Sequence, residues 1–335
     1  MAEKKKNGTL KVTLAFVIMA LLLLVVFFFA INTGGIDVTF TQLLRGMFIE
    51  YDKDVAIVLQ LRFPRIIVAI LGGALMAGSG VLMQAVMRNP LADPGIIGVV
   101  SGAAFVAVLV TAFLPSLAYL TPIFSFFGGL LAFLIVYMLS MKGGASPVRL
   151  VLTGIAVDAV FTGFYEAFEA ATGSTYSGVQ SIVEGNVTLK DWDDVIMMLI
   201  YFVVCTVLCV LVAGRCNLLA LSDKTVLGLG VNINRSRFLI ALIAVLMASI
   251  FTAVIGSVSF LGLIVPHIAR LIVGSDHKKL IPFSMLTGAV IFLMADTVGR
   301  LIAYPYEISP AIIMSIVGGP AFIILLMRNG KSYGT

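Results

Sequence analysis

The sequence predicts an all-α, polytopic membrane protein with about ten transmembrane helices and both termini in the cytoplasm. Of its 335 residues, 60% are hydrophobic and only 12% are charged, and the mean hydropathy is +1.12. A soluble domain cannot bury that much apolar surface. In addition, uncharged apolar runs of roughly 20 residues, long enough to cross about 30 Å of hydrocarbon as helices, recur along the chain. The placement of the basic residues is the third observation.

Ten stretches fit a membrane span. The first carries no charge, and although Lys4, Lys5 and Lys6 precede it, its length and the phenylalanines near its end favour a membrane helix over a cleaved signal peptide. The fifth and eighth contain charges or a proline and are accepted partly because the charge pattern then agrees. The ten stretches are Val12–Ile31, Ile66–Val86, Ile96–Phe113, Thr121–Met141, Val148–Ala171, Val195–Val212, Phe238–Ile255, Val258–Val273, Leu280–Leu301 and Ile308–Met327.

Lysine and arginine set the orientation. Ten spans place both termini on one side, and with the termini inside, sixteen of the 22 basic residues lie in the cytoplasm and six outside. The outer loops are acidic instead, as in Glu50, Asp52 and Asp54. This is the asymmetry of the positive-inside rule. No loop is long enough to fold by itself, so residues 1–335 are expected to form one transmembrane domain.

Several chemical motifs are absent. The sequence has no Gly-x-x-x-x-Gly-Lys-Ser/Thr phosphate loop, no His-Glu-x-x-His helix and no Gly-x-Ser-x-Gly elbow. His267 and His277 are the only histidines, and Cys205, Cys209 and Cys216 lack nearby metal-ligating partners, which favours small buried side chains. We therefore expect no catalytic, cofactor or metal site on this chain and no nucleic-acid partner. Any ATP is expected on a separate subunit.

A turn-rich motif joins the second and third spans. Leu61-Arg-Phe-Pro-Arg65 opens the second span, and Arg88-Asn-Pro-Leu-Ala-Asp-Pro-Gly-Ile-Ile-Gly98 follows it. The prolines stop a helix, and the Asn and Asp side chains supply turn hydrogen bonds. Because proline suits the first turn of a helix, Asp93-Pro94 is expected to open the third span. Taken alone, the motif is typical of any well-capped helical hairpin.

Together with motifs further on, this stretch resembles the iron-chelate and cobalamin uptake permeases of binding-protein-dependent ABC importers. The resemblance covers nearly the whole chain, and so many motifs in the right order are more specific than one short pattern. Two segments depart from it: Ile182–Asn186 lacks the usual aromatic and serine, and Ala145–Val148 matches an inner gate only loosely. The matching positions are Leu61–Arg65, Gln84, Asn89–Gly98, Ser101-Gly102, Gly228–Gly230, Gly262–Arg270 with Gly274, Ala295-Asp296 with Arg300, and Glu307 through Pro320.

The resemblance implies a permease that pairs with a second permease, identical or paralogous, and with a cytoplasmic ABC ATPase dimer that binds ATP. It also implies an extracellular or periplasmic substrate-binding protein. The inner loop at about 215–230 would form short coupling helices that sit in a cleft of the ATPase; alternatively, it rests on the bilayer surface. The implied coupling residues are Leu218, Leu219, Ala220, Leu221, Ser222, Val226, Leu227, Gly228, Leu229 and Gly230.

Three arginines stand at the outer ends of their spans: Arg62, Arg65 and Arg300. The resemblance implies that they meet acidic knobs on the binding protein. The planar guanidinium fork suits this role, because it can bind a carboxylate with two hydrogen bonds. The alternative is that these side chains extend to lipid headgroups.

The fifth span carries three carboxylates: Asp158, Glu166 and Glu169. Asp158 and Glu169 share a helix face, because residues eleven apart differ by about 20° in direction. By resemblance this span lines a path between two permeases, so we expect an acidic stripe along the path. The alternatives are pairing with a neighbouring helix, or Glu169 in the outer headgroup region. The resemblance further implies an inner gate at Ser146, Pro147 and Val148.

We therefore expect the permease subunit of an ATP-binding-cassette importer for a ferric siderophore or haem, working by alternating access. An acidic path would mildly favour a hydroxamate-type siderophore over haem, whose propionates are negative. A cobalamin importer permease is one alternative, and an ATP-independent secondary transporter that binds its coupling ion at the acidic stripe is another. An intramembrane enzyme is disfavoured because no nucleophiles or metal ligands cluster.

Overall fold

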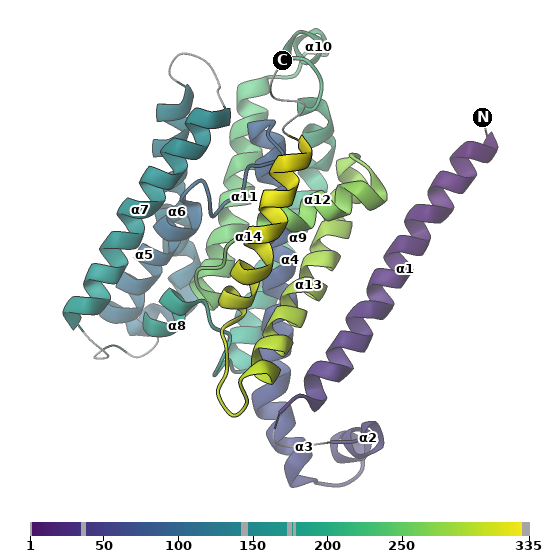
Figure 1. Cartoon of the computed structure of the whole chain (residues 1–335), viewed down its shortest axis with the longest axis vertical. Coiled ribbons are helices and arrows are strands. Elements are labelled where there is room, and N and C mark those ends of the chain that lie inside the picture. Colours follow the sequence, from purple (N-terminus) through teal and green to yellow (C-terminus); the bar gives the residue numbers. More distant parts are fainter. Residues whose placement is uncertain (1, 35–37, 142–146, 173–175, 177–178, 330–335) are drawn as a thin grey trace.

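The computed structural model describes residues 2–34, 38–141, 147–172, 176 and 179–329 (Figure 1). Every regular element in these ranges is helical, and none of them is a strand. The elements are α1 (Ala2–Asn32), α2 (Phe40–Phe48), α3 (Lys53–Ile57), η1 (Val58–Arg62), α4 (Phe63–Met87), α5 (Val99–Phe113), η2 (Pro115–Leu120), α6 (Thr121–Met141), α7 (Pro147–Thr172), α8 (Val179–Glu184), α9 (Trp192–Leu219), α10 (Asp223–Gly228), α11 (Ile233–Ile255), α12 (Leu261–Val273), α13 (His277–Ile302) and α14 (Pro310–Asn329).

Within the described ranges, seven helical stretches are long and apolar enough to cross a membrane, and three shorter apolar helices accompany them. Each of the ten predicted spans falls on one of these stretches, so the predicted all-α membrane fold is confirmed. The number of crossings and the side of the termini stay predictions. α1 begins and α14 ends at the end of the bundle where α10 projects, opposite α2 and α3 (Figure 1). We call the end with α10 the inner end and the other the outer end, following the predicted topology.

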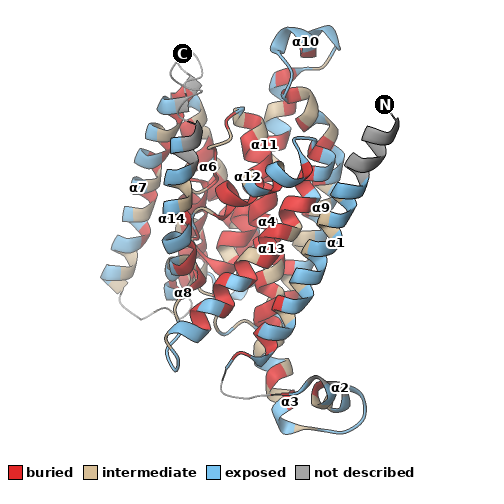
Figure 2. Ribbon diagram, turned by 45° about the vertical axis from the view of Figure 1, so that its right-hand side comes forward, coloured by how far each residue is buried: buried red, intermediate tan, exposed pale blue. Residues whose placement is uncertain are grey.

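Helix α4 is the centre of the bundle (Figure 2). It packs against α13, α11, α9 and α12. In the helical run that contains α4, 89% of the apolar 18-residue stretch that could cross a membrane is buried, compared with 17% in α1. Gly73 faces Gly288 of α13, and Gly80 faces Gly262 of α12. A Cβ on either α4 residue would overlap the opposite carbonyl oxygen. Such small residues let helices pack closely in a membrane, where lipid provides no hydrophobic drive between them.

Helices α1, α7 and α9 lie at the periphery of the bundle, and many of their large apolar residues are exposed (Figure 2). In each of these helices, less than a third of the apolar 18-residue stretch that could cross a membrane is buried: 17% in α1, 28% in α7 and 28% in α9. Since membrane-spanning helices expose apolar residues to lipid or to a partner, these faces are available to both.

The expected start of the third span is wrong. α5 begins at Val99, and residues 94–98 form turns instead of a first helical turn at Asp93-Pro94. The reason is that this segment forms a single turn: the Asp93 carboxylate caps it by accepting hydrogen bonds from the amides of Gly95 (2.7 Å) and Ile96 (3.3 Å), and Gly98 then ends it. Gly98 then takes a left-handed conformation, with φ +79°, directly before the helix.

The long outer connection between the first two spans is mostly helical. Thr39 caps α2 by accepting a hydrogen bond from the Gln42 amide, and Asp52 caps α3 by accepting from the amides of Asp54 and Val55. α3 continues through η1 into α4. This segment therefore places Arg62 and Arg65 at the outer end of one continuous helical run.

Candidate functional site

The inner loop that the sequence predicts for coupling, residues 215–230, projects from the inner end of the bundle, and we call it the coupling loop after that prediction (Figures 1 and 2). α9 ends at Leu219, and the Ser222 hydroxyl caps α10 by accepting a hydrogen bond from the Thr225 amide (3.3 Å). Gly230, with φ +73°, turns the chain back toward α11. The result is a small, capped helix that stands outside the bundle.

The projection exposes several apolar side chains. Val226 is buried against the base of the loop, whereas Leu221, Leu227 and Leu229 are 42%, 63% and 59% exposed. Of the other predicted coupling residues, Leu219 is buried, Leu218 is half-buried and Ala220, Ser222, Gly228 and Gly230 are exposed. Exposed apolar side chains grouped on a projecting segment are typical of a surface that binds a protein or a membrane.

Arg88 joins the coupling loop to the end of α4. Its Nε donates to the carbonyl of Leu219 (2.7 Å) and its Nη2 to the carbonyl of Leu221 (2.9 Å). The same Nη2 lies 2.6 Å from an Asp223 carboxylate oxygen, and a guanidinium nitrogen of Arg237 lies 3.5 Å from that oxygen. Carbonyls at the end of a helix lack partners within the helix, so a guanidinium is suited to bind them.

The sequence did not predict this role of Arg88. The residue stands in the motif after the second span, but its partners lie 131 and 133 residues further along the chain. The signal available was its position: an arginine directly after a membrane helix, on the same side as the coupling loop.

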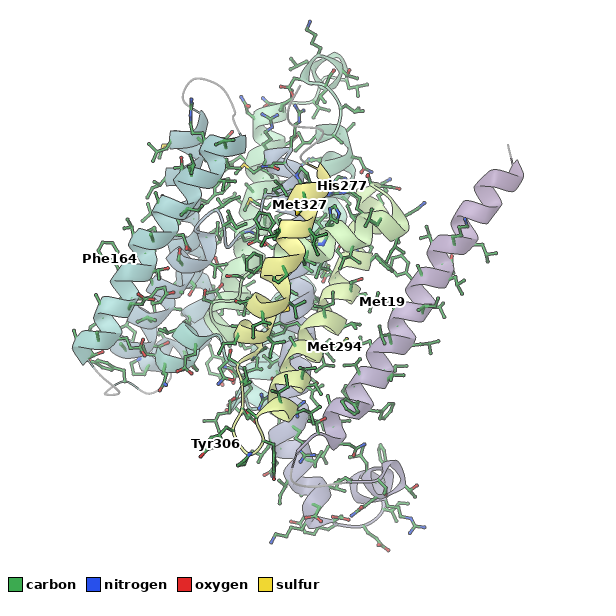
Figure 3. The ribbon with its side chains drawn as sticks, viewed as in Figure 1. Met19, Phe164, His277, Met294, Tyr306 and Met327 are labelled. Carbon is green, nitrogen blue, oxygen red and sulfur yellow. The ribbon has the colours of Figure 1, made fainter. Side chains whose placement is uncertain are left out.

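A second attachment holds the end of α9 to the start of α13. The Asn217 amide nitrogen donates to the Asp276 carboxylate (2.8 Å), and its carbonyl oxygen lies 2.8 Å both from the His277 backbone nitrogen and from His277 Nδ1. The hydrogen bond from Asn217 holds the pKa of Asp276 below its usual range. His277 lies at the inner end of the bundle (Figure 3). We call Arg88, Asn217, Asp223, Arg237, Asp276 and His277 the inner cluster.

At the outer end, Arg65 lies in a buried group of charges. It is 7% exposed, and its Nη2 lies 2.7 Å from Oδ1 of Asp296, to which its Nε also donates (3.0 Å). Its Nη1 lies 2.7 Å from Oε2 of Glu307, which also accepts a hydrogen bond from Thr188 (3.1 Å). Burial opposes ionisation of Glu307, but the hydrogen bond and charge of Arg65 outweigh it and hold the pKa of this carboxyl below its usual range.

Arg300 completes this group from α13. Its Nε lies 3.3 Å from Asp296, and its Nη1 donates to the carbonyls of Ala30 and Thr33 (3.2 Å each). Arg62 is half-buried and donates to the carbonyl of Ile31. All these carbonyls lie at or just beyond the C-terminal end of α1. We call Arg65, Asp296, Arg300 and Glu307 the outer cluster.

The three predicted docking arginines are thus bound to other parts of this chain. Docking through them stays a prediction, and two of the three guanidinium groups have little exposed surface. The sequence did not indicate this burial, because Asp296 and Glu307 lie more than two hundred residues from Arg65. One signal was present: Asp296 stands four residues before Arg300, the spacing at which oppositely charged side chains meet on a helix.

The three carboxylates of α7 lie in different surroundings. Asp158 is half-buried and hydrogen-bonded to Ser101 of α5, Glu169 is half-buried, and Glu166 is exposed. On the same helix, Phe164 is 54% exposed, and its ring lies 5.6 Å from that of Phe105 on α5, centroid to centroid (Figure 3). An acidic stripe along a path stays a prediction. The contact with Ser101 also fits the alternative, in which Asp158 pairs with a neighbouring helix.

The predicted inner gate is only partly visible. Ser146 lies outside the described residues, Pro147 begins α7, and Val148 is 67% exposed at the inner end of that helix. Among the residues that the structure describes, no three His, Cys, Asp or Glu side chains lie close enough to hold a metal ion. The cysteines are buried and unpaired with one another.

Comparison with known proteins shows similarities in sequence and in structure. The model of the FecCD transport family matches residues 22–328. The Staphylococcus aureus protein named "Probable heme-iron transport system permease protein IsdF", from strains MSSA476 and MW2, is 37% identical over 322 residues, covering 96% of this chain and 98% of its own.

Two solved structures share the fold. An ABC transporter described as metal-chelate type, in an inward-facing conformation, gives a TM-score of 0.78 at 27% identity, covering 95% of this chain and 99% of that one. PsaBC from Streptococcus pneumoniae, in complex with Fab, gives a TM-score of 0.56 at 17% identity, covering 86% of this chain and 95% of that one.

Proposed function

The chain belongs to the FecCD transport family, and we propose that it is the permease subunit of a bacterial ABC importer for an iron chelate, either haem or a ferric siderophore. Its apolar helices and its permease relatives make it a multi-pass protein of the bacterial plasma membrane. The observation that carries the proposal is 37% identity, over almost the full length of both chains, to a permease named for heme-iron transport. Residues 1–335 would act as one transmembrane domain.

Haem is the first ligand to test because of that relative's name. A ferric siderophore is the second, since the structural relative is described as metal-chelate type. The α7 carboxylates favour a neutral or cationic siderophore only if they line the path, because they would repel the propionates of haem. Cobalamin stays the alternative within the same class of importer.

ATP would be hydrolysed by a separate cytoplasmic ATPase dimer, which would bind the coupling loop. The apolar patch of Leu221, Leu227 and Leu229 on α10 and its flanks supports this proposal, since a partner could bury it. Alternating access would follow when closure of the ATPases displaces α10. The same patch at the bilayer surface is the competing assignment.

A substrate-binding protein would dock at the outer end. There Glu307 is the most accessible member of the outer cluster, with 39% of its side chain exposed, whereas Asp296 is fully buried. An acidic side chain from a docking protein would therefore replace Glu307 beside Arg65 and leave the pair with Asp296 intact. Arg62 and Arg300 would contribute positive charge around it.

The path would run between this permease and a second one, identical or paralogous. The peripheral face of α7 would line it, with Asp158, Glu166 and Glu169 along its length. The inner gate would be formed by Ser146, Pro147 and Val148. In this arrangement the apolar exposed faces of the bundle divide between lipid and the second permease.

The test is iron uptake by a strain that lacks this chain and carries it again on a plasmid. We expect loss of uptake of haem, of a ferric trihydroxamate siderophore, or of both, and its return with the plasmid. If the strain loses uptake of cobalamin and of neither iron chelate, the ligand is cobalamin and the proposed iron chelate is wrong. Uptake that survives removal of the ATPase but fails without a proton gradient would indicate a secondary transporter instead.

A further inference from the structure

The loop of residues 88–98 lies between the coupling loop and α7, two parts of the molecule whose movements the proposed function requires to be linked. At its first residue, Arg88 ends α4 in a left-handed conformation, with φ 48°, which turns its side chain out of the helix and toward the coupling loop. There it holds the carbonyls of Leu219 and Leu221 and the carboxylate of Asp223. A displacement of α10 therefore acts directly on Arg88.

The 88–98 loop is held by its own hydrogen bonds. The Asn89 side chain accepts from the Leu91 amide (3.0 Å), and the Asp93 backbone carbonyl accepts from Ile97 (3.0 Å). Val99, the first residue of α5, donates to the carbonyl of Pro94 (3.0 Å). Asn89 and Asp93 are 4% and 2% exposed, so the loop is packed into the bundle. Such a segment moves as one body more readily than it deforms.

The far end of the loop rests on the backbone of α7. A Cβ on Gly154 of α7 would overlap the carbonyl oxygen of Ile96. A Cβ on Gly98 would lie 3.3 Å from the backbone nitrogen of Asp158, also on α7. At Gly154 the contact is with backbone atoms alone, and at Gly98 the nearest atom is Cγ1 of the branched Val157 side chain (3.2 Å). A shift of the loop must therefore be followed by α7 or open a gap.

We propose that Arg88 is a positioning residue for energy coupling, which transmits the displacement of α10 through the 88–98 loop to α7, the helix assigned to the path. This inference rests on the proposed function, since it needs an ATPase at α10. A competing route exists through Arg237, which also approaches Asp223 (3.5 Å) but belongs to α11 and does not join the loop.

The first experiment uses the complete transporter with its ATPase and binding protein in proteoliposomes. The probe is whichever of haem and a ferric trihydroxamate the wild type imports, and the readout is chelate imported per ATP hydrolysed. We expect Arg88→Gln to lower this ratio at least tenfold while ATP hydrolysis continues and the ATPase stays bound. Arg88→Lys, which keeps the charge near Asp223 but cannot bind both carbonyls in the same way, should recover part of the ratio.

The matched control is Arg237→Gln, which removes an equal charge beside the same carboxylate. We expect its ratio to stay within twofold of the wild type. An equal fall for both arginine variants would overturn the proposal, because anchoring of α10 alone would then explain the effect. An unchanged ratio for Arg88→Gln would overturn it as well.

A second pair of variants tests the far end of the loop without touching the ATPase. Gly154→Ala inserts a methyl group against the Ile96 carbonyl, whereas Gly163→Ala on the same helix meets nothing within 4 Å. We expect the first to lower the import ratio at least fivefold and the second to leave it unchanged. Equal import ratios for Gly154→Ala and Gly163→Ala would contradict transmission through the loop. This comparison can be made even if the Arg88→Gln transporter does not assemble. Wild-type import without ATP would contradict the proposed function itself, which separates the two failures.

Discussion

The outer and inner clusters contain similar side chains in opposite settings. In the outer cluster, Arg65 and Arg300 share Asp296, whose side chain is fully buried, and the three belong to two central helices. In the inner cluster, Arg88 binds Asp223, whose side chain is 53% exposed, and Asp223 belongs to a short helix outside the bundle. One cluster fixes helices to each other, and the other fixes a projection to a helix.

This difference indicates which end of the molecule can change conformation more easily. Breaking a buried ion pair by removing one partner leaves an uncompensated charge and strongly destabilises a protein, whereas exposed pairs contribute little. Movement is therefore expected at the inner end, where α10 can shift with its arginine attached. Within the outer cluster, Glu307 is the member that can exchange its partner, because 39% of its side chain is exposed.

The largest expected effect comes from Asp296→Asn. This change leaves Arg65 and Arg300 charged but without their shared carboxylate, and we expect a loss of about 3–5 kcal/mol in the free energy of unfolding. Asp223→Asn is the matched change at the inner end and should lower it by less than about 1 kcal/mol. Thermal unfolding of the two purified variants in detergent measures the difference. Equal losses would remove the contrast between the clusters.

The next effect concerns the apolar patch at the inner end. Leu227→Ser with Leu229→Ser should weaken binding of the ATPase by roughly 2–4 kcal/mol, since burying the exposed part of each leucine contributes about 1–2 kcal/mol. Co-purification from membranes measures it. Val210→Ser with Leu211→Ser, two exposed residues on α9, is the control and should not release the ATPase. If the variant with Leu227→Ser and Leu229→Ser still retains the ATPase, the ATPase binds a surface other than this apolar patch.

A smaller effect is expected for Glu307→Gln at the outer end. Removing the carboxylate that competes for Arg65 should tighten docking of the binding protein about threefold to tenfold, equivalent to roughly 1 kcal/mol. Glu184→Gln is the control, because Glu184 is exposed at the same end and its carboxylate accepts a hydrogen bond from Gln180 (2.6 Å), outside the outer cluster. Weaker docking by Glu307→Gln would mean that Glu307 itself belongs to the docking surface.

The smallest effect is in the pH dependence of that variant. Because the folded state lowers the pKa of Glu307, its ion pair with Arg65 is fully present above the unfolded value of about 4.3 and is lost as pH falls through the lower folded value. The difference in docking affinity between wild type and Glu307→Gln should therefore stay constant from pH 8 to about 5 and shrink below about 4. Titration of binding across this range measures it. A difference that already vanishes near pH 6 would contradict the ion pair.

The sequence predicted the membrane helices well because apolar length and basic-residue asymmetry act locally. Each predicted span falls on a helix, and the inner loop predicted for coupling proved to be a separate projection. Contacts between distant segments were not accessible in this way. Arg65 looked like an exposed docking residue, and nothing near it in the sequence indicated Asp296 and Glu307. The start of α5 was misjudged because Gly98 takes a left-handed conformation that separates the turn capped by Asp93 from the helix, and the preference of proline for a first turn does not reveal this.

The most direct test of the central claim is affinity isolation of the tagged chain from native membranes, with the stoichiometry of the proteins that accompany it. The account predicts two permease subunits with two ATPase subunits, and a binding protein that joins when its chelate is present. Isolation of the chain by itself from membranes that retain proton-driven chelate uptake would contradict an ATP-driven importer.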